Sequence, residues 1–153
     1  MASPMLSVLG MTGVTVEQTE LSLPSRLEAV AEGANAVAEF LNRAGVSEEA
    51  AFGIDMAVRE GIANAVIHGN KLDEEKVVTI IVAKSANTLE IKVRDQGQGF
   101  NLETISDPTA AENILKTSGR GIFLMRNFMD EVGWTALPEG GTVLRMIKKL
   151  ENS

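Results

Sequence analysis

The sequence contains no cysteine, which excludes disulfide bonds and thiolate metal sites. A single histidine argues against a structural zinc site as well. Basic residues are fewer than acidic ones, 14 against 21, so the net charge is −7. Because no basic stripe is available to neutralise nucleic-acid phosphates or an anionic membrane surface, we predict neither as a direct partner.

Long apolar segments are also missing. No uninterrupted apolar run approaches the roughly 20 residues that a membrane-spanning helix needs. The first basic side chain is Arg26, so we expect no secretory signal and predict a cytoplasmic location. We expect residues 1–12 to be poorly ordered or to form a dimer arm. Residues 13–150 are predicted to form one domain, since 153 residues suffice for one core but not for two of ordinary size.

The order of helix and strand patterns predicts the fold class. Residues 12–23 alternate as a strand does, and two helices are expected next, over about 25–44 and 47–68. The first helix opens with a capping-box pair, Ser25 and Glu28. Later segments predict strands at 77–83, 89–94, 132–137 and 142–148, and a helix from 119 to about 129. Hairpin-linked strands with a few helices predict an α+β fold, a two-layer sandwich.

The second predicted helix has an apolar sector, expected to pack on the sheet, and an opposite polar face. That face carries Glu60 and Asn64 one turn apart, with His68 one turn further on. Very small residues surround them, namely Gly53, Ala57 and Gly61. A solvated face is the alternative, but it normally carries long side chains, and glycine costs about 1 kcal/mol in a helix. Small residues suit a bulky ligand near the backbone, and Glu with Asn suits Mg²⁺ and phosphate, whereas His68 is interpreted as structural.

A first glycine cluster directly follows a predicted strand, in the order Asp95, Gly97, Gly99. Taken alone, this pattern also fits an ordinary turn at a strand end. Glycines let a ligand approach the backbone closely. A carboxylate at the strand end can accept a hydrogen bond from an exocyclic amine such as that of adenine.

A second cluster, Gly119-Arg120-Gly121, opens the last predicted helix. Exposed N–H groups at a helix N-terminus bind anions, and an arginine fork adds bidentate donors for phosphate. The spacing is not that of a Walker A loop, and Leu124 breaks the dinucleotide-binding pattern. A simple capped helix start remains the alternative.

Four ordered motifs together resemble the GHKL, or Bergerat-fold, ATPase superfamily of gyrase, Hsp90, histidine kinases and MutL. They are EGIANAVIHGN (60–70), DQGQGF (95–100), SGRGIFLMRNFMDEV (118–132) and GTVLRM (141–146). Their order and spacing agree with that superfamily over residues 14–150. The resemblance implies a mostly antiparallel or mixed sheet with helices on one face. Within the superfamily, NAVIHGN and GIFLMRNFMDEV are most similar to bacterial anti-sigma-factor serine kinases.

This resemblance implies a protein serine/threonine kinase that uses ATP and Mg²⁺. Such proteins are homodimers that sequester a sigma factor and phosphorylate a serine of an anti-anti-sigma antagonist. By the same resemblance, Glu60 would receive the substrate hydroxyl proton, Asn64 would ligate Mg²⁺ and Asp95 would accept from the adenine amino group. The remaining implied nucleotide contacts are Gly97 and Gly99 in the adenine pocket, Thr142 at the adenine end, Gly119, Gly121 and Arg120 at the phosphates, and Lys116 on a lid over residues 101–118.

Two other functions stay open at this point. The chain could be an ATP-binding partner-switch module without kinase activity, although the retained Glu60 favours catalysis. It could also be a detached histidine-kinase-type catalytic domain, but the sequence has no helix pair with a phosphorylatable histidine. Gyrase-like and MutL-like ATPases need a transducer domain that the sequence does not contain.

Overall fold

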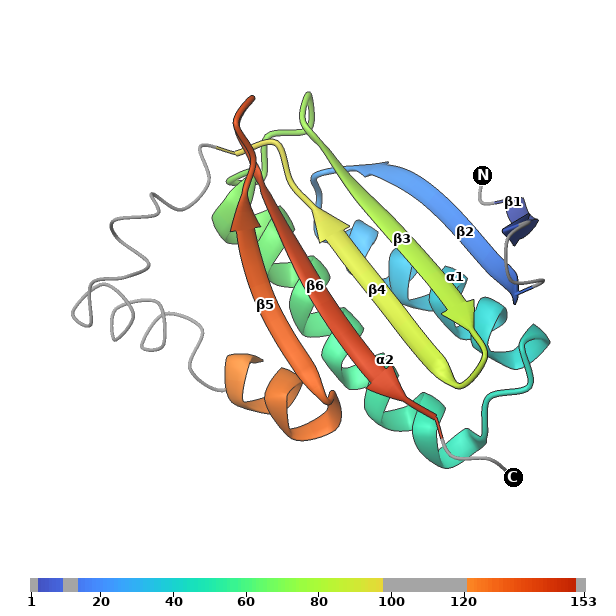
Figure 1. The fold of residues 1–153 in the computed structure, drawn as a ribbon. Coiled ribbons are helices and arrows are strands. Elements are labelled where there is room, and N and C mark those ends of the chain that lie inside the picture. The colour runs from blue at the N-terminus through green and yellow to red at the C-terminus, as the bar shows by residue number, and fades with distance from the viewer. Residues whose placement is uncertain (1–2, 10–13, 98–120, 151–153) are drawn as a thin grey trace.

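The computed structural model describes residues 3–9, 14–97 and 121–150. In chain order they form β1 (Ser3–Leu9), β2 (Val14–Pro24), α1 (Glu28–Arg43), α2 (Glu48–Ala63), the π-helix η1 (Asn64–Gly69), β3 (Val77–Ser85), β4 (Thr88–Arg94), a helix over residues 121–128, β5 (Glu131–Ala136) and β6 (Thr142–Lys149). The strands make one sheet in the order β1-β2-β3-β4-β6-β5, and every pairing is antiparallel. The helices lie on one face of this sheet, so the α+β two-layer prediction is confirmed (Figure 1).

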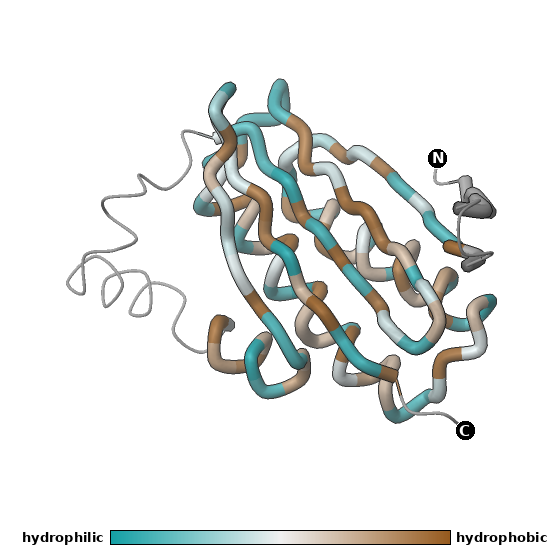
Figure 2. The backbone as a smooth tube through the Cα atoms, viewed as in Figure 1, coloured by the Kyte–Doolittle hydropathy of each residue, from teal (hydrophilic) through white to brown (hydrophobic). Residues whose placement is uncertain are grey.

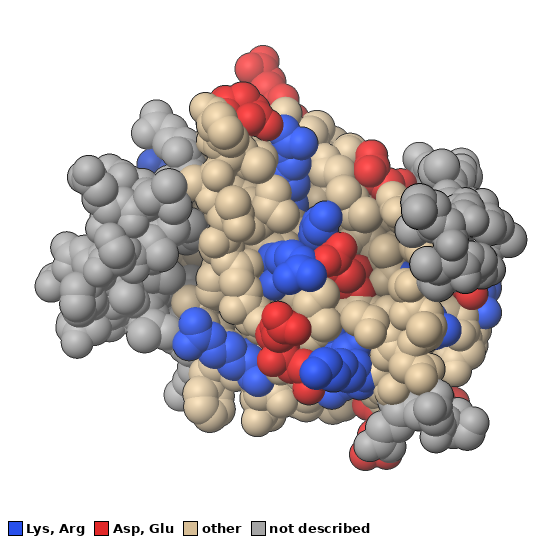
Figure 3. All heavy atoms as spheres, viewed as in Figure 1, with Lys and Arg blue, Asp and Glu red and all other residues tan. Residues whose placement is uncertain are grey.

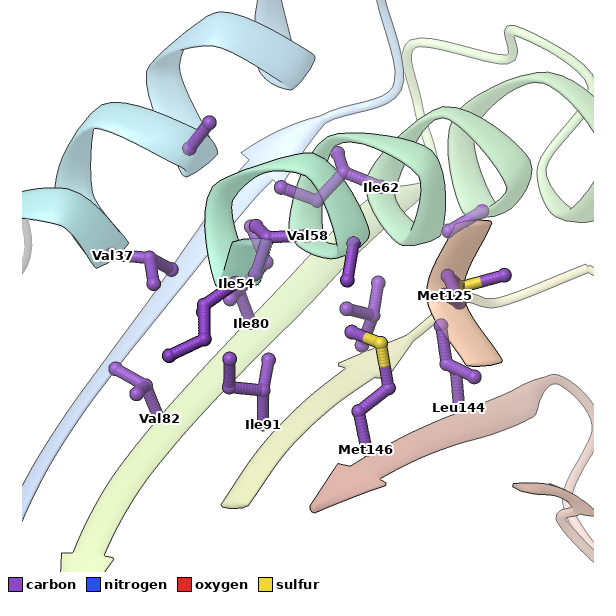
Figure 4. Packing of buried hydrophobic residues seen from close by; sticks show 14 of the residues in the cluster. Val37, Ile54, Val58, Ile62, Ile80, Val82, Ile91, Met125, Leu144 and Met146 are labelled. Atoms are coloured by element: carbon purple, nitrogen blue, oxygen red, sulfur yellow. The ribbon is translucent and has the colours of Figure 1, made fainter. Parts of the chain in front are cut away.

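The hydrophobic core lies between the helices and the sheet (Figure 4). The apolar sector of α2 packs there as expected, with Ile54, Val58 and Ile62 fully buried. Every second residue of the central strands points into the same layer, for example Ile80 in β3 and Ile91 in β4. The resulting alternation is visible along the strands in Figure 2. Among the described helices, none combines the length and apolar character needed to cross a membrane.

The outer face of the sheet is polar, and its centre carries intermixed positive and negative side chains (Figure 3). Glu90 of β4 lies between two cations, with Arg145 Nε at 2.6 Å and Lys92 Nζ at 3.6 Å. Arg94 makes a further ion pair with Glu139 at 3.1 Å. Such exposed pairs contribute little stability individually. Charged residues are tolerated on this face because it is exposed, whereas the opposite face packs on the core.

Local sequence signals set several element ends. Ser47 is the N-cap of α2, and its hydroxyl accepts a hydrogen bond from the Ala50 N–H at 3.2 Å. Gly45 ends the preceding helix with φ +76°, a conformation that favours glycine. The β3–β4 hairpin turns at Ala86, which also has a positive φ of 52°. These ends depend only on neighbouring residues, so the sequence is sufficient to predict them.

One prediction about the N-terminal part was wrong. The capping box of Ser25 and Glu28 does not form: the N-cap of α1 is Leu27, without a side-chain cap hydrogen bond. Instead, the Ser25 hydroxyl donates to the Lys76 carbonyl at 2.8 Å, a contact 51 residues away. This difference arises from a contact with a distant part of the chain. Within the segment expected to be poorly ordered or to form a dimer arm, residues 3–9 form β1 and pair with β2.

The contribution of the core can be measured with two leucines of different exposure. Leu41 in α1 is 1% exposed, whereas Leu27 at its N-cap is 59% exposed. Leu41→Ala should lower the free energy of unfolding by about 2–5 kcal/mol, because it leaves a cavity. Leu27→Ala should change it by about 0.5 kcal/mol or less. Urea unfolding followed by circular dichroism tests this, and equal losses in both variants would contradict the described core.

Candidate functional site

The exposed side of α2 presents a carboxylate and an amide. Glu60 in α2 and Asn64 at the start of η1 are both half-buried and lie one turn apart. Within the described part of the chain, neither side chain has a hydrogen-bond or ion-pair partner.

Gly121, which begins the helix over residues 121–128, lies against Glu60. A Cβ atom added to Gly121 would stand 2.5 Å from Glu60 Oε2, so the carboxylate would have to move aside for a side chain there. The start of this helix therefore faces the carboxylate directly. Backbone N–H groups at such an N-terminus bind anions. The structure thus brings together two of the predicted site residues that are 61 positions apart in the sequence.

The second group of site residues centres on Asp95, which directly follows β4 and is only 8% exposed. Its Oδ1 atom accepts hydrogen bonds from the N–H groups of Gly97 at 3.0 Å and Thr142 at 3.2 Å. Burial raises the pKa of the Asp95 carboxyl above its ordinary value of 3.8, while these two hydrogen bonds and the charge of Lys76 oppose the rise. Asp95 is therefore a buried acceptor held in a defined orientation.

Glycines allow the backbone to pack tightly around Asp95. A side chain on Gly69, the last residue of η1, would collide with Asp95 Oδ2. A side chain on Gly97 would collide with the carbonyl oxygen of Gly69. Gly141 has φ +93°, and a Cβ there would collide with the Asp95 carbonyl oxygen. The glycines thus join the end of η1, the turn after β4 and the start of β6 around one carboxylate.

Thr142, the first residue of β6, is part of the same cluster. Its backbone N–H donates to Asp95 Oδ1, and its carbonyl accepts from the Asp95 N–H at 3.0 Å. Its hydroxyl oxygen is buried and has no hydrogen-bond partner within the residues described. A buried hydroxyl without a partner is costly, so this atom suits a polar group of a ligand or a bound water.

The two groups lie along one continuous helical segment. Glu60 lies in α2, and Gly69, nine residues further on, ends η1. One end offers Glu60, Asn64 and a helix N-terminus, which suit phosphate and a cation. The other end offers the carboxylate of Asp95 and a free hydroxyl, which suit a base with an amino group. The arrangement matches an extended nucleotide.

The interpretation of the small residues of α2 was wrong in part. Gly53 does not make room for a ligand, because the ring of Phe128 packs over it, 2.7 Å from where a Cβ would lie. Gly61 faces the sheet, where a Cβ would stand 2.8 Å from Leu144 Cδ2. Ala57 is fully buried in the core. These residues are small because a helix and a strand pack closely on α2.

Other sequence predictions had different outcomes. Four predicted site residues lie outside the described residues, and so does the lid over residues 101–118: Gly99, Lys116, Gly119 and Arg120. His68 is exposed, and within the described part of the chain its side chain makes no hydrogen bond, so its expected structural role stays a prediction. The single helix predicted over 47–68 changes at Asn64 from α to π geometry.

Asn70 and Gln96 were not identified as site residues from the sequence. Asn70 is the last residue of the motif at 60–70, yet no role was assigned to it; it is 1% exposed. Its amide donates to Ser25 Oγ at 2.6 Å, and its oxygen accepts from the Gln96 N–H at 2.7 Å. A glycine followed by an asparagine is also the usual signature of a helix end, so the sequence alone did not single Asn70 out.

Comparison with known proteins agrees with this geometry. Residues 23–148 match the family described as Histidine kinase-like ATPase domain. The chain is 35% identical over 119 residues to the anti-sigma F factor of Bacillus thuringiensis, covering 76% of this chain and 82% of that protein. It is 37% identical over 102 residues to the anti-sigma F factor of Anoxybacillus flavithermus, covering 65% of this chain and 70% of that one.

Two solved structures share the fold. The RsbU and RsbW domains of a Mycobacterium tuberculosis protein align with a TM-score of 0.66 at 18% identity, over 89% of this chain. The alignment spans 33% of that longer chain. The SiaB–SiaC complex of Pseudomonas aeruginosa aligns with a TM-score of 0.62 at 14% identity, over 84% of this chain and 87% of that one.

The raised pKa of Asp95 predicts how stability depends on pH. Well below pH 3.8 the Asp95 carboxyl is protonated in both the folded and the unfolded chain. Because its pKa is higher in the folded chain, the protonated form contributes to the free energy of unfolding, and this contribution is lost as the pH rises through the folded-state pKa. Asp95→Asn keeps an oxygen acceptor for Gly97 and Thr142 but cannot ionise. The free energy of unfolding of Asp95→Asn relative to the unmodified chain should therefore increase between about pH 3 and pH 7. Urea titrations across this range test it; a difference that stays flat or shrinks would contradict the buried-carboxylate description.

Proposed function

Because the chain belongs to the histidine kinase-like ATPase domain family, we propose that it is an anti-sigma factor with ATP-dependent serine-protein kinase activity. The observation that carries this proposal is the position of Glu60, a carboxylate without a described partner that faces the start of the helix at Gly121. The names of the relatives support the anti-sigma role. The proposed partners are a sigma factor and an anti-anti-sigma protein that carries the target serine, and the proposed assembly is a homodimer.

The residues of the site fit ATP from both ends. At the base end, Asp95 is fixed by two backbone N–H groups and accepts from the adenine amino group, and the unpartnered Thr142 hydroxyl serves the same end. At the phosphate end, the N–H groups that begin the helix at Gly121 bind phosphate oxygens. Purine selectivity then depends on Asp95, and phosphate binding depends on the helix start.

Magnesium also fits the phosphate end. The described residues contain no cluster of three or more His, Cys, Asp or Glu side chains that could hold a metal by themselves. Mg²⁺ bound to nucleotides commonly uses one or two protein ligands together with phosphate oxygens and water. The Asn64 amide oxygen is such a ligand, and the ion would neutralise charge on the transferred phosphoryl group.

Glu60 performs the protein's part of the transfer. Its carboxylate accepts the hydroxyl proton of the substrate serine and orients that oxygen toward the terminal phosphorus. Phosphoryl transfer depends mainly on positioning and charge neutralisation, so a single oriented carboxylate is sufficient as the base. The helix start beside it holds the phosphate chain against this carboxylate.

Glu60→Gln tests the catalytic role. The amide keeps the shape of the side chain but cannot accept the proton, so transfer of labelled phosphate to an anti-anti-sigma protein should fall about 10²–10⁴-fold. ATP affinity, measured by calorimetry, should change little. Glu49→Gln, an exposed change on the same helix, is the matched control and should transfer normally. Undiminished transfer by Glu60→Gln would exclude Glu60 as the base, and no transfer by the unmodified chain would indicate a partner-switch module without kinase activity.

Asn64→Ala tests the magnesium ligand. Loss of groups that merely orient metal ligands typically weakens metal affinity 10–100-fold, so loss of the ligand itself should weaken ATP binding in Mg²⁺ at least about tenfold. In EDTA the variant and the unmodified chain should bind ATP equally. Asn42→Ala, at an exposed position of α1, is the control and should behave as the unmodified chain does. An equal loss with and without Mg²⁺ would show that Asn64 contacts the nucleotide in another way.

A further inference from the structure

Asn70 uses its side-chain amide to join three elements of the fold. Its Nδ2 atom donates to Ser25 Oγ at 2.6 Å, just after β2, and to the Val77 carbonyl at 3.0 Å, at the start of β3. Its Oδ1 atom accepts from the Gln96 N–H at 2.7 Å, in the turn that follows β4. Both amide hydrogens and the oxygen are thus satisfied at a site that is almost fully buried.

The hydrogen bond to Gln96 acts on the backbone next to Asp95. The Gln96 side chain forms a second link, because its Oε1 accepts from the Val77 N–H at 2.7 Å. The turn at residues 95–97 is therefore tied once to the start of β3, through the Gln96 side chain, and once to Asn70, directly after η1. On its other side, Asn70 directly follows Gly69, against which Asp95 Oδ2 lies. Asn70 thus constrains the backbone that carries Asp95. It also constrains Gly69, which the Asp95 carboxyl faces.

The backbone after Asn70 is strained. Lys71 has φ 54° and Leu72 has φ 59°, two consecutive non-glycine residues in the left-handed region. Such conformations are unfavourable and persist only where surrounding contacts enforce them. Here the Leu72 N–H donates to the Val66 carbonyl at 2.8 Å, and the Asn70 N–H to the Ala65 carbonyl at 2.8 Å. The turn thus holds Asn70 in place despite the strain, which is typical of segments that serve a site.

We propose that Asn70 is the positioning residue for adenine recognition: through the Gln96 N–H it orients the Asp95 carboxylate toward the amino group of the base. Asn70 does not touch the nucleotide. This inference rests on the proposed ATP site and adds a specific claim, that discrimination among purines depends on one hydrogen bond behind Asp95. A merely structural Asn70 would affect the binding of all nucleotides equally.

Inosine triphosphate is the probe that separates these roles, because it carries an oxygen where ATP carries the amino group. The unmodified chain should bind ATP at least about tenfold more tightly than inosine triphosphate, as expected for a hydrogen bond to a charged acceptor. Asn70→Ala should lower the affinity for ATP about tenfold and the affinity for inosine triphosphate about twofold or less, so that the preference nearly disappears. Calorimetry on the full chain with both nucleotides in Mg²⁺ measures this.

Two further variants separate positioning from stability. Ser25→Ala removes a hydroxyl of the same buried network but leaves the Asn70–Gln96 bond, so it should lower the melting temperature and keep the preference for ATP. Asn70→Asp retains an oxygen for the Gln96 N–H and loses the two donated bonds, so it should also keep the preference while losing stability. If Asn70→Ala does not fold, Asn70→Ser replaces it, because its hydroxyl is too short to reach Gln96.

Each outcome decides the proposal. A parallel loss of affinity for both nucleotides in Asn70→Ala, with the preference intact, would overturn it and leave Asn70 a structural residue. Loss of the preference in Ser25→Ala or Asn70→Asp would overturn it too, because the Gln96 bond would not be its cause. If the unmodified chain did not distinguish the two nucleotides, the adenine role of Asp95 would fail, and the role of Asn70 with it. None of these results decides the proposed kinase activity, which transfer by the unmodified chain and by Glu60→Gln tests separately.

Discussion

The buried carboxylate of Asp95 accepts two backbone hydrogen bonds, from Gly97 and Thr142, and the arrangement of the site depends on this interaction. Burying a carboxylate is unfavourable unless hydrogen bonds compensate. The two N–H groups supply part of that compensation, and they belong to segments that are 45 residues apart in the chain. The close approach of Gly69 and Gly141 follows from the same requirement, since the backbone must reach the carboxyl from several sides. One acidic side chain thus explains why glycines gather here.

Helix α2 serves the core and the site with opposite faces. Ile54, Val58 and Ile62 are buried against the sheet, whereas Glu60 and Asn64 lie on the exposed side. The change to π geometry at Asn64 adds a residue to the turn, which alters the direction in which later residues point. Gly69 consequently contacts Asp95. The next side chain, that of Asn70, joins the buried network by accepting from the Gln96 N–H. A π segment at this place is consistent with the frequent occurrence of such turns at functional sites.

The network of Ser25, Asn70 and Gln96 shows how polar groups can specify an arrangement that apolar packing would not. Every hydrogen bond in it connects the end of one element with the end of another. Apolar side chains of similar volume would fill the same space without fixing the orientation of the backbone. Polar groups inside a protein are costly unless all are satisfied, so the network tolerates little displacement. The network therefore fixes the position of the turn after β4 relative to the end of η1.

The sequence by itself determined the features that depend on near neighbours: the Ser47 cap, the stop at Gly45, the two hairpins, and the pairing of Glu60 with Asn64 one turn apart. Ordered motifs also led to the prediction that Asp95, Gly121 and Thr142 belong to one site. Only the tertiary structure decided the rest. Ser25 bonds to Lys76 rather than capping a helix, β1 pairs with β2, Gly53 and Gly61 accommodate Phe128 and Leu144, and Asn70 reaches Gln96. Those outcomes depend on contacts between residues that are distant in the chain, and residue types or spacings alone do not reveal which distant groups will meet.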